Sequence, residues 1–480
     1  MKAWVERLLA LVALITALAF GGTVPLAYSF MEIAVFLLLF AVVAVECYRG
    51  HRTVRLPWPV GLLMIWVGLE LVPLPARVVG WLSPMRAGLM ASIAPRWVSG
   101  AWWTLSIDPH RTLLNFLKLL AYVAAFVLAS WAFSPRQGKS SIVNGLVVLG
   151  SFEALYGLYQ YLGHHQKIFG YTKVAYTTDA TGTYINRNHF AGLLELIIPL
   201  TVAAGFYQIQ LWRRERWRAT RRSEENHVAA YRGLFLLFLV IIMGVAAICS
   251  HSRMGIFGMF VSLIFILLLS QARSGTRVWK AASLLIIFGI LAYGIWVGLG
   301  PALHRFENLG KRGYLEQEGR LHIWEGAKRL IQNYPLTGTG LGTFGEAYRH
   351  YQHYLTYAYV THAHSDIIEF TCNIGILGAI LLFGSILWLW GQSIRAFFGE
   401  MGEYRRAITL GCIGSTLALL IHSTADFNLQ IPANALIWAM ILGMNYKAVH
   451  LRKEEGRVPV ALAGKPPSPE GVEHGAIRLT

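Results

Sequence analysis

Apolar residues in this chain come in long runs separated by short polar segments. A helix crosses hydrocarbon about 30 Å thick with roughly 20 apolar residues, because each residue rises about 1.5 Å. Backbone groups in lipid must pair within their own segment, so such runs are helices. The pattern predicts about twelve membrane-spanning helices. We place them near residues 7–25, 28–47, 58–75, 112–133, 141–162, 188–210, 232–250, 254–271, 281–300, 365–390, 407–423 and 432–449.

Lysine and arginine fall in every second loop between these runs. These residues are Arg49, Arg52, Arg55, Arg136, Lys139, Arg213, Arg214, Arg216, Arg218, Arg221, Arg222, Arg273, Arg277, Lys280, Arg395, Arg405 and Arg406, followed by Arg452, Lys453 and Arg457 in the tail. Basic loops stay on the cytoplasmic side. The alternation therefore predicts that both termini are cytoplasmic. The opposite side then receives the segments 76–111, 163–187, 301–364 and 424–431.

The segment 301–364 is the longest loop and is not of low complexity, so we expect it to fold. Apolar residues at helical spacing predict one helix near 318–333 and a second, aromatic helix near 342–357. Pro335 and the glycines up to Gly342 predict a turn between them. We divide the chain into 1–300 with spans one to nine, the outer loop 301–364, 365–450 with spans ten to twelve, and a disordered cytoplasmic tail 451–480.

Composition narrows the class of protein further. The chain is 55% hydrophobic and only 14% charged, which excludes an ordinary soluble domain. Its net charge of +17 lies mostly in the loops, where membrane topology requires it, so nucleic acid is not an expected partner. The four cysteines lie in or beside apolar runs without close spacing, so we expect neither disulfides nor a zinc site.

Candidate chemistry begins where the long loop enters span ten, at Thr361-His-Ala-His-Ser-Asp-Ile-Ile-Glu-Phe370. His362 and His364 lie two residues apart, so they cannot share one helix face and would form a poor metal pair. An imidazole at the mouth of a span is suited to proton transfer, because its pKa lies near ambient pH. Taken alone, a histidine such as His364 is more often an interfacial or hydrogen-bonded residue than a catalytic one.

Three arginines lie on the same predicted side of the membrane. Arg253 occupies a turn too short to leave the membrane region. A charged side chain at that depth costs free energy unless it has a partner or faces a wet cavity. Alternatively, the guanidinium snorkels to the interface. Arg320 and Arg187 could each be an ordinary surface charge. If these side chains converge, they form a diphosphate site, because guanidinium groups match phosphate oxygens.

Ionisable residues near or within the spans are functional candidates by default. Asp426 lies four residues after His422, and it either orients a catalytic side chain or caps the following turn. Gly338-Thr-Gly-Leu-Gly342 lacks the strand, acid and Gly-Lys-Ser end of nucleotide sites and is interpreted as a turn. The other acids near or within the spans are Glu32, Glu70, Glu153, Glu195 and Glu369.

Several of these motifs recur together in a known family. They are Gly182-Thr-Tyr-Ile-Asn-Arg-Asn-His-Phe-Ala191, Ser252-Arg-Met-Gly255, Gly319-Arg-Leu-His-Ile-Trp324, Tyr334-Pro-Leu-Thr-Gly-Thr-Gly-Leu-Gly-Thr-Phe344, His362-Ala-His-Ser365 and Gly375-Ile-Leu-Gly378. In this order, over roughly residues 180 to 430, the chain resembles the O-antigen ligase and O-antigen polymerase superfamily. One departure is Ser365, where the family usually has Asn.

The resemblance implies an all-α, glycosyltransferase C-like protein of the bacterial inner membrane, with its active site in the periplasm. It implies a metal-independent glycosyltransferase without a cofactor, whose donor is a glycan linked to undecaprenyl diphosphate. His364 is then the general base, and Arg253, Arg187 and Arg320 hold the diphosphate. Supporting roles fall to His362, Asp426 and Asn188.

The acceptor stays open among lipid A core, the growing glycan, a protein hydroxyl and another polymer. We favour an O-antigen ligase that transfers glycan to lipid A core, with a polysaccharide polymerase or a protein O-oligosaccharyltransferase as the alternatives. A different class is a twelve-span flippase for lipid-linked glycans or another transporter. A transporter should show paired repeats and broken helices around a midplane site, whereas the polar residues here cluster in one outer loop.

Overall fold

The computed structural model describes residues 1–50, 56–93, 102–135, 138–218, 227–274, 288, 292, 319–352 and 359–451. Nearly all of the predicted span 281–300, the loop segment 301–318 and the tail 452–480 lie outside these residues. The chain divides into two units, Met1–Val449 and His450–Thr480. Of the second unit, only His450 and Leu451 are described.

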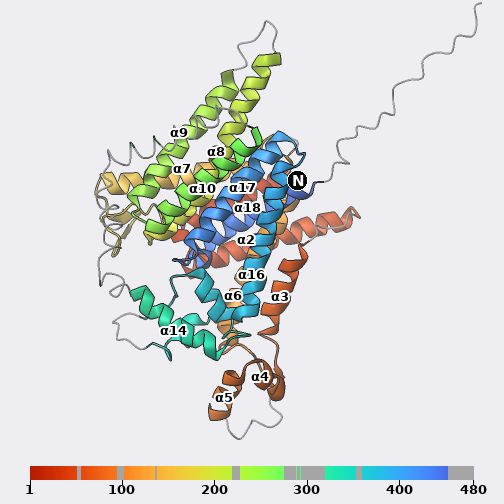
Figure 1. Ribbon diagram of the computed structural model, residues 1–480, viewed down its shortest axis with the longest axis vertical. Helices are drawn as coiled ribbons and strands as arrows, with labels where there is room; N and C mark the ends of the chain where they lie inside the picture. Colours follow the sequence, from red (N-terminus) through yellow and green to blue (C-terminus); the bar gives the residue numbers. More distant parts are fainter. Residues whose placement is uncertain are drawn as a thin grey trace, which may run out of the picture. The chain divides into compact units, whose positions relative to one another are not determined.

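The described elements are almost all helices (Figure 1). In chain order they are α1 (Lys2–Leu18), η1 (Phe20–Gly22), α2 (Pro25–Tyr48), α3 (Trp58–Leu69), β1 (Leu74–Pro75), α4 (Ala76–Leu82), α5 (Pro84–Ile93), β2 (Trp102–Trp103), α6 (Pro109–Ala132), α7 (Ser141–Leu162), β3 (Lys167–Ile168), β4 (Tyr171–Thr172), α8 (Arg187–Arg218), α9 (His227–Cys249), α10 (Arg253–Ser274), α14 (Gly319–Asn333), α15 (Phe344–Tyr348), α16 (Asp366–Phe398), α17 (Glu403–His422), η6 (Asn428–Gln430) and α18 (Pro432–His450). The strands form two antiparallel pairs, β1 with β2 and β3 with β4.

Seven of the described helices are long and apolar enough to cross a membrane: α2, α6, α7, α8, α9, α10 and α16. Each predicted span within the described residues coincides with a helix, which confirms a helical membrane protein. The total of twelve spans stays a prediction. Helix α3 is shorter than expected, because it has 12 residues and ends at Leu69 rather than near residue 75.

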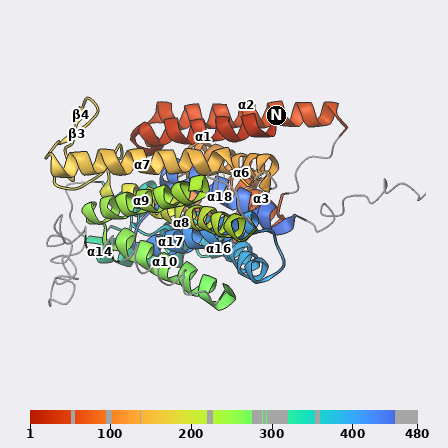
Figure 2. The same ribbon diagram turned by 90° about the horizontal axis from the view of Figure 1, so that it is seen from above.

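Helix α8 forms the centre of the bundle. It packs against α9, α17, α10 and α7, and Figure 2 shows α1 and α2 on one outer side of the bundle and α10 on the other. Its apolar residues are buried all round, including Leu193, Ile197 and Leu200 at 0% exposure. A helix that is apolar on every face is expected at such a position. Its first turn, which carries Arg187 and His189, is therefore fixed by the surrounding core.

The two predicted sets of loops lie at different ends of these helices. At one end Arg273 donates to the carbonyl of Phe398 at 2.7 Å, and Arg214 pairs with Glu403. These contacts join the C-terminal parts of α8 and α10 to the end of α16 and the start of α17. At the other end, Ile107 N in the segment 76–111 donates to Thr339 O in the long loop at 2.9 Å. The segments predicted to share a side thus meet, whereas the cytoplasmic or periplasmic identity of each side stays a prediction.

The long loop differs from expectation in its second helix. Helix α14 confirms the prediction near 318–333. The predicted helix 342–357 is wrong over its described part, because α15 contains only the 5 residues Phe344–Tyr348. Residues 353–358 lie outside the described residues. The aromatic residues at helical spacing instead fill a small core, in which Phe344 and Tyr348 are both buried.

The predicted glycine-rich turn between α14 and α15 is confirmed, and it forms hydrogen bonds to a break in α16. Helix α16 is interrupted at Gly375, whose φ of 70° and ψ of 176° are not helical. The turn runs beside this break, where Thr339 N donates to Cys372 O at 3.0 Å and Gly340 N donates to Asn373 O at 2.7 Å. Gly340 has a φ of 110°, which only glycine adopts readily. The turn therefore satisfies carbonyl groups that the break leaves without helical partners.

Candidate active site

His364 is positioned by the N-terminus of α16. Ser365 is the N-cap, and its Oγ accepts from Ile368 N at 3.4 Å, so serine performs the capping here. Asp366 N donates to the carbonyls of Ser423 and Asp426, each at 3.0 Å. These bonds tie the start of α16 to the segment between α17 and α18. His364 itself has a φ of 51°, a strained conformation for a side-chain-bearing residue.

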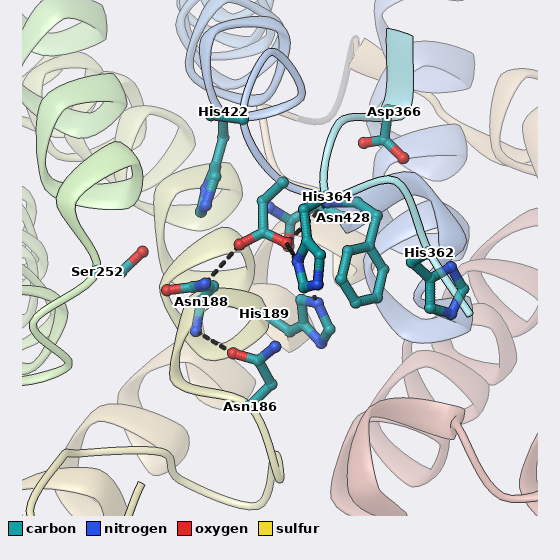
Figure 3. Close-up of polar contacts among 12 residues, drawn as sticks. Asn186, Asn188, His189, Ser252, His362, His364, Asp366, His422 and Asn428 are labelled. Atoms are coloured by element: carbon teal, nitrogen blue, oxygen red, sulfur yellow. Dashed lines mark hydrogen bonds and ion pairs between the residues drawn. The ribbon is translucent and has the colours of Figure 1, made fainter. Parts of the chain in front are cut away.

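Asn188, His189 and His364 lie close together in Figure 3, and the carboxylate of Asp426 lies within 4.0 Å of all three side chains. Its Oδ2 accepts a hydrogen bond from Asn188 Nδ2 and lies 3.7 Å from Arg320 Nη2. Its Oδ1 lies 3.8 Å from His189 Nε2 and 4.0 Å from His364 Nδ1. Asp426 also accepts from the backbone of the next residue. The carboxylate thus links α8, α14 and the start of α16. Its role is therefore not limited to capping the turn that follows it.

The charge state of this cluster follows from burial and neighbours. Burial alone would raise the pKa of Asp426, but His189, His422 and Arg320 favour its anion and hold its pKa below the ordinary value. Burial lowers the pKa of His364, and the positive charge of Arg320 lowers it further, although Asp426 opposes both. At neutral pH the cluster therefore pairs a carboxylate with a neutral imidazole that can accept a proton.

A cavity of about 220 Å³ adjoins Asp426 and receives the three predicted arginines. Arg187 comes from the start of α8, Arg253 from the start of α10 and Arg320 from α14, and all three line the cavity. Arg320 also donates to the carbonyl of Ala425 at 2.7 Å. The structure thus brings together side chains that lie 133 residues apart in the chain (320 − 187). Their role toward a diphosphate stays a prediction.

Arg187 is held by Asp179, a residue that the sequence analysis missed. Arg187 Nη1 donates to Asp179 Oδ2 at 2.7 Å, and His251 Nδ1 lies 2.6 Å from the other carboxylate oxygen. Burial would raise the pKa of Asp179, but the hydrogen bonds and charges of His251 and Arg187 outweigh it, so the pKa lies below the ordinary value. No local motif marks Asp179, because its partners come from two other segments.

A second missed relationship lies at the same cavity. His422 Nδ1 is 2.9 Å from Glu195 Oε1, and both side chains are fully buried. His422 also lines the arginine cavity. The sequence marked Glu195 as an acid within a span and His422 as a neighbour of Asp426, but it gave no signal that they pair. The carboxylate fixes the ring orientation of an imidazole that faces the cavity.

His362 does not join the arginine cavity. Its Nδ1 lies 2.9 Å from Glu369 Oε1, and its ring stacks on Phe427 at a centroid distance of 4.1 Å. Burial lowers the pKa of His362, but the charge and hydrogen bond of Glu369 raise it more, so the pKa lies above the ordinary value. His362 lines a different cavity of about 210 Å³. His362 therefore faces a cavity without the three arginines, whereas His364 lies next to Asp426, which lines the arginine cavity.

The chemistry available at the site follows from these groups. Within the residues that the structure describes, no group of three or more His, Cys, Asp and Glu side chains could hold a metal ion. Guanidinium groups from three elements can instead hold an anion and stabilise charge on a departing oxygen. A neutral imidazole beside them can take a proton from a hydroxyl.

These features define a helical membrane protein with an arginine-lined cavity and an adjacent imidazole where several helices end. Residues 238–383 match a family model described as O-antigen ligase. The match confirms the resemblance drawn from the motifs, and it implies a glycosyltransferase of the ligase or polymerase type. The matched segment contains Arg253, Arg320 and His364, whereas Arg187 and Asp426 lie outside it. A search of curated proteins found no match to this chain.

Proposed function

We propose that this protein transfers a glycan from an undecaprenyl-diphosphate carrier to an acceptor hydroxyl at the periplasmic face of the bacterial inner membrane. The single observation that carries the proposal is the convergence of Arg187, Arg253 and Arg320 on one cavity next to Asp426 and His364. A lipid diphosphate is an anion that such a cavity fits. The family match supports the reaction class.

The reaction balances with the residues at hand. His364 removes the proton of the acceptor hydroxyl, and the resulting oxygen forms a bond to the anomeric carbon of the donor sugar. The bond between that carbon and the diphosphate oxygen breaks, and undecaprenyl diphosphate leaves with the electron pair. The three arginines stabilise the charge on its oxygens. The proton on His364 then passes to solvent, and no metal ion takes part.

Among members of this class, we favour an O-antigen ligase with lipid A core as the acceptor. A polysaccharide polymerase and a protein O-oligosaccharyltransferase use the same donor and the same departing group, so the arginine cavity fits them equally. Deleting the gene and examining surface glycans separates the first two. Loss of capped lipopolysaccharide, with polymer still built on carrier lipid, indicates a ligase, whereas single repeat units on the core indicate a polymerase.

The competing class is a flippase or another transporter. Purified protein in liposomes that moves a lipid-linked glycan, and moves it equally well as the His364→Ala variant, would favour transport. The proposed transferase instead loses glycan transfer in His364→Ala and in Arg253→Ala while both variants insert and express normally. Full transfer activity in both variants would reject the proposal.

A further inference from the structure

An apolar groove and a polar cavity adjoin one another apart from the arginine cavity. The groove lies between α3, α6, α16 and α18, has a volume of about 150 Å³ and is lined by side chains such as Leu63, Val123, Ile386 and Trp438. The polar cavity is the space of about 210 Å³ that His362 lines. Of the residues that the structure describes, none lines both this pair of spaces and the arginine cavity. The pair is therefore a candidate site separate from the one proposed for the diphosphate.

One face of α6 changes from charged to apolar along the two spaces. Arg111, Asn115 and Lys118 are spaced four and three residues apart, so they share this face, and all three line the polar cavity. Asn115 and Lys118 also line the groove, in which Leu119 and Tyr122 continue the same face. An amphiphile has the same order of chemistry along its length. Its hydrocarbon chain fits the groove, and its headgroup then lies toward the start of α6.

Lys118 places a charge where the groove meets the polar cavity. It lies nine residues after the first residue of α6 (118 − 109), which is about 14 Å along a helix long and apolar enough to cross the membrane. Its ammonium group lies 4.0 Å from the centroid of the Tyr28 ring. A charged side chain at such depth is costly, and one that faces a cavity is a functional candidate by default.

Gln430 supplies a second polar group at the same junction. It lines both spaces, and its Nε2 atom is buried and has no hydrogen-bond partner among the described residues. A buried donor without a partner is costly, and an acceptor oxygen on a ligand would satisfy it. In a phospholipid the ester carbonyls, which only accept hydrogen bonds, lie between the hydrocarbon chains and the headgroup. The position of Gln430 between the groove and the cavity matches that order.

The polar cavity has more positive than negative charge among its described lining residues. The cations are Arg111, Lys118 and Arg349, and the carboxylates are Glu346 and Glu369. Glu346 lies between the two arginines, at 2.9 Å from Arg111 and 3.4 Å from Arg349. Glu369 pairs with His362 at 2.9 Å. Both carboxylates therefore have other partners, and one positive charge remains without a carboxylate in the cavity.

Two further carboxylates act on these cations from outside the two spaces. Asp108 lies 3.7 Å from Arg111, and the charge of Glu32 acts on Lys118. Neither acid lines the groove or the cavity. An anion in the cavity would therefore meet the cations at contact distance and these two acids at longer range. Because electrostatic energy falls with distance, attraction outweighs repulsion for such an anion.

We propose that the groove and the polar cavity together bind an anionic phospholipid with a single phosphodiester charge, such as phosphatidylglycerol. An acyl chain lies in the groove, an ester carbonyl lies beside Gln430, and the phosphate lies beside Lys118 and Arg111. A zwitterionic headgroup would add a cation to a cavity that already has an excess of them, and a neutral headgroup would leave Lys118 without a counter-ion. The lipid is a resident ligand and not a substrate, so the inference goes beyond the proposed function and does not depend on it.

The binding test uses the full-length protein in phosphatidylcholine nanodiscs. The probe is phosphatidylglycerol with a photoreactive diazirine midway along one acyl chain, and cross-linked peptides are mapped by mass spectrometry. Mapping is needed because the basic loops at the other end of the helices also attract anionic lipids. We expect labelling of α6 and α16 at the groove, with competition by unlabelled phosphatidylglycerol. Phosphatidylcholine with the same diazirine chain should not label these peptides above the level of other lipid-facing peptides, and inorganic phosphate should not compete.

Charge variants test the headgroup contact. Lys118→Gln removes the proposed partner of the phosphate and should weaken competition by phosphatidylglycerol about tenfold. Glu346→Gln enlarges the positive excess and should strengthen competition about threefold. Arg329→Gln is the control and should change nothing, because Arg329 pairs with an exposed carboxylate and does not line the cavity. Opposite effects of two substitutions in one cavity indicate electrostatic recognition, since damage to the fold would weaken binding in both.

A second pair of variants tests the chain contact. Leu119→Trp places an indole in the groove, and Leu113→Trp is its matched control, because Leu113 is 44% exposed and lies outside the groove on the same helix. Displacing about two methylene groups of the lipid should lower groove labelling about tenfold in Leu119→Trp and leave it unchanged in Leu113→Trp. Size-exclusion profiles and thermal unfolding establish that the variants fold.

Four results would overturn the inference. Equal labelling by phosphatidylcholine would mean that bulk lipid fills the groove, and competition by inorganic phosphate would mean that the cavity is a site for small anions. Stronger competition by undecaprenyl diphosphate than by phosphatidylglycerol would assign the groove to the donor tail. Unchanged competition in a folded Lys118→Gln variant would place the phosphate elsewhere. Glycan transfer does not enter these measurements, so this site and the proposed function fail separately.

Discussion

His364 Nδ1 lies 4.0 Å from Asp426 Oδ1, where the start of α16 meets the segment between α17 and α18. This separation is too long for a hydrogen bond, so the carboxylate acts on the imidazole through its charge. Burial and Arg320 lower the pKa of His364 more than Asp426 raises it. The proposed base is therefore neutral over a wider pH range than an exposed histidine.

This relationship predicts the pH dependence of glycan transfer. A base must be unprotonated to act, so the rate should hold as the pH falls through 6.5 and should drop only at more acid pH. Asp426→Asn removes the group that raises the pKa of His364, so the acid limb should move to still lower pH. Initial rates measured between about pH 4 and 8 test both expectations. An acid limb at or above the ordinary value, or an upward movement in Asp426→Asn, would contradict them.

His364→Ala should lower the rate of transfer by about 10²- to 10⁴-fold, because the loss of a positioned general base costs this much. The matched control is His165→Ala, since His165 is an exposed histidine that stacks on Tyr159 away from the cluster. It should transfer at the normal rate. Single-turnover assays with a lipid-linked donor measure the effect, and equal rates for the two variants would remove His364 from the mechanism.

Arg253→Ala should weaken donor binding about 10- to 100-fold, the effect of losing a charged hydrogen-bonding group. Arg253→Lys should recover only part of it, because an ammonium group cannot bind two phosphate oxygens as a guanidinium does. Arg329→Ala is the control, because Arg329 forms an exposed pair with Glu325. The kcat/KM for the donor is the quantity to compare, and a normal kcat/KM in Arg253→Ala would exclude a diphosphate contact.

Asp179→Asn should destabilise the protein by about 3–5 kcal/mol, because it breaks a buried pair and leaves Arg187 without its partner. Glu325→Gln, in the exposed pair, should change the free energy of unfolding by about 1 kcal/mol or less. The depressed pKa of Asp179 gives stability above its unfolded pKa, about 3.9, and this stability is lost as the pH falls through the folded value. Thermal unfolding from neutral to acid pH should therefore show a smaller acid loss in Asp179→Asn.

Gly375→Ala should lower the free energy of unfolding by about 1–3 kcal/mol. Residue 375 has a positive φ, which alanine adopts poorly, and the added Cβ would meet the carbonyl of Leu336. Gly384→Ala, in the same helix, should be neutral or slightly stabilising, because nothing lies near its Cβ position. Thermal unfolding of the two variants in one detergent compares them directly. Equal stabilities would mean that the turn and the break do not depend on each other.

The sequence by itself determined the helices and the loops that lie together. Lipid forces each apolar run to satisfy its own backbone, so run length alone predicts elements such as α2, α9 and α16. The spacing of basic residues then predicted which loops share an end, and the motifs predicted the family. Helix length failed at α3 and α15. Helix α3 ends where Ser106 N donates to Glu70 O, just before β1 pairs with β2. The aromatic side chains of α15 pack into a small core instead of marking a longer helix.

Only the tertiary structure decided how the charged groups are distributed among the cavities. The sequence raised the meeting of Arg187, Arg253 and Arg320 as a hypothesis, but it could not test it, because three separate helices must be packed before their ends meet. It gave no sign that Asp179 holds Arg187 or that His362 lines a cavity without the three arginines. Pairing of buried charges depends on distance in space, and distance along the chain carries little information about it.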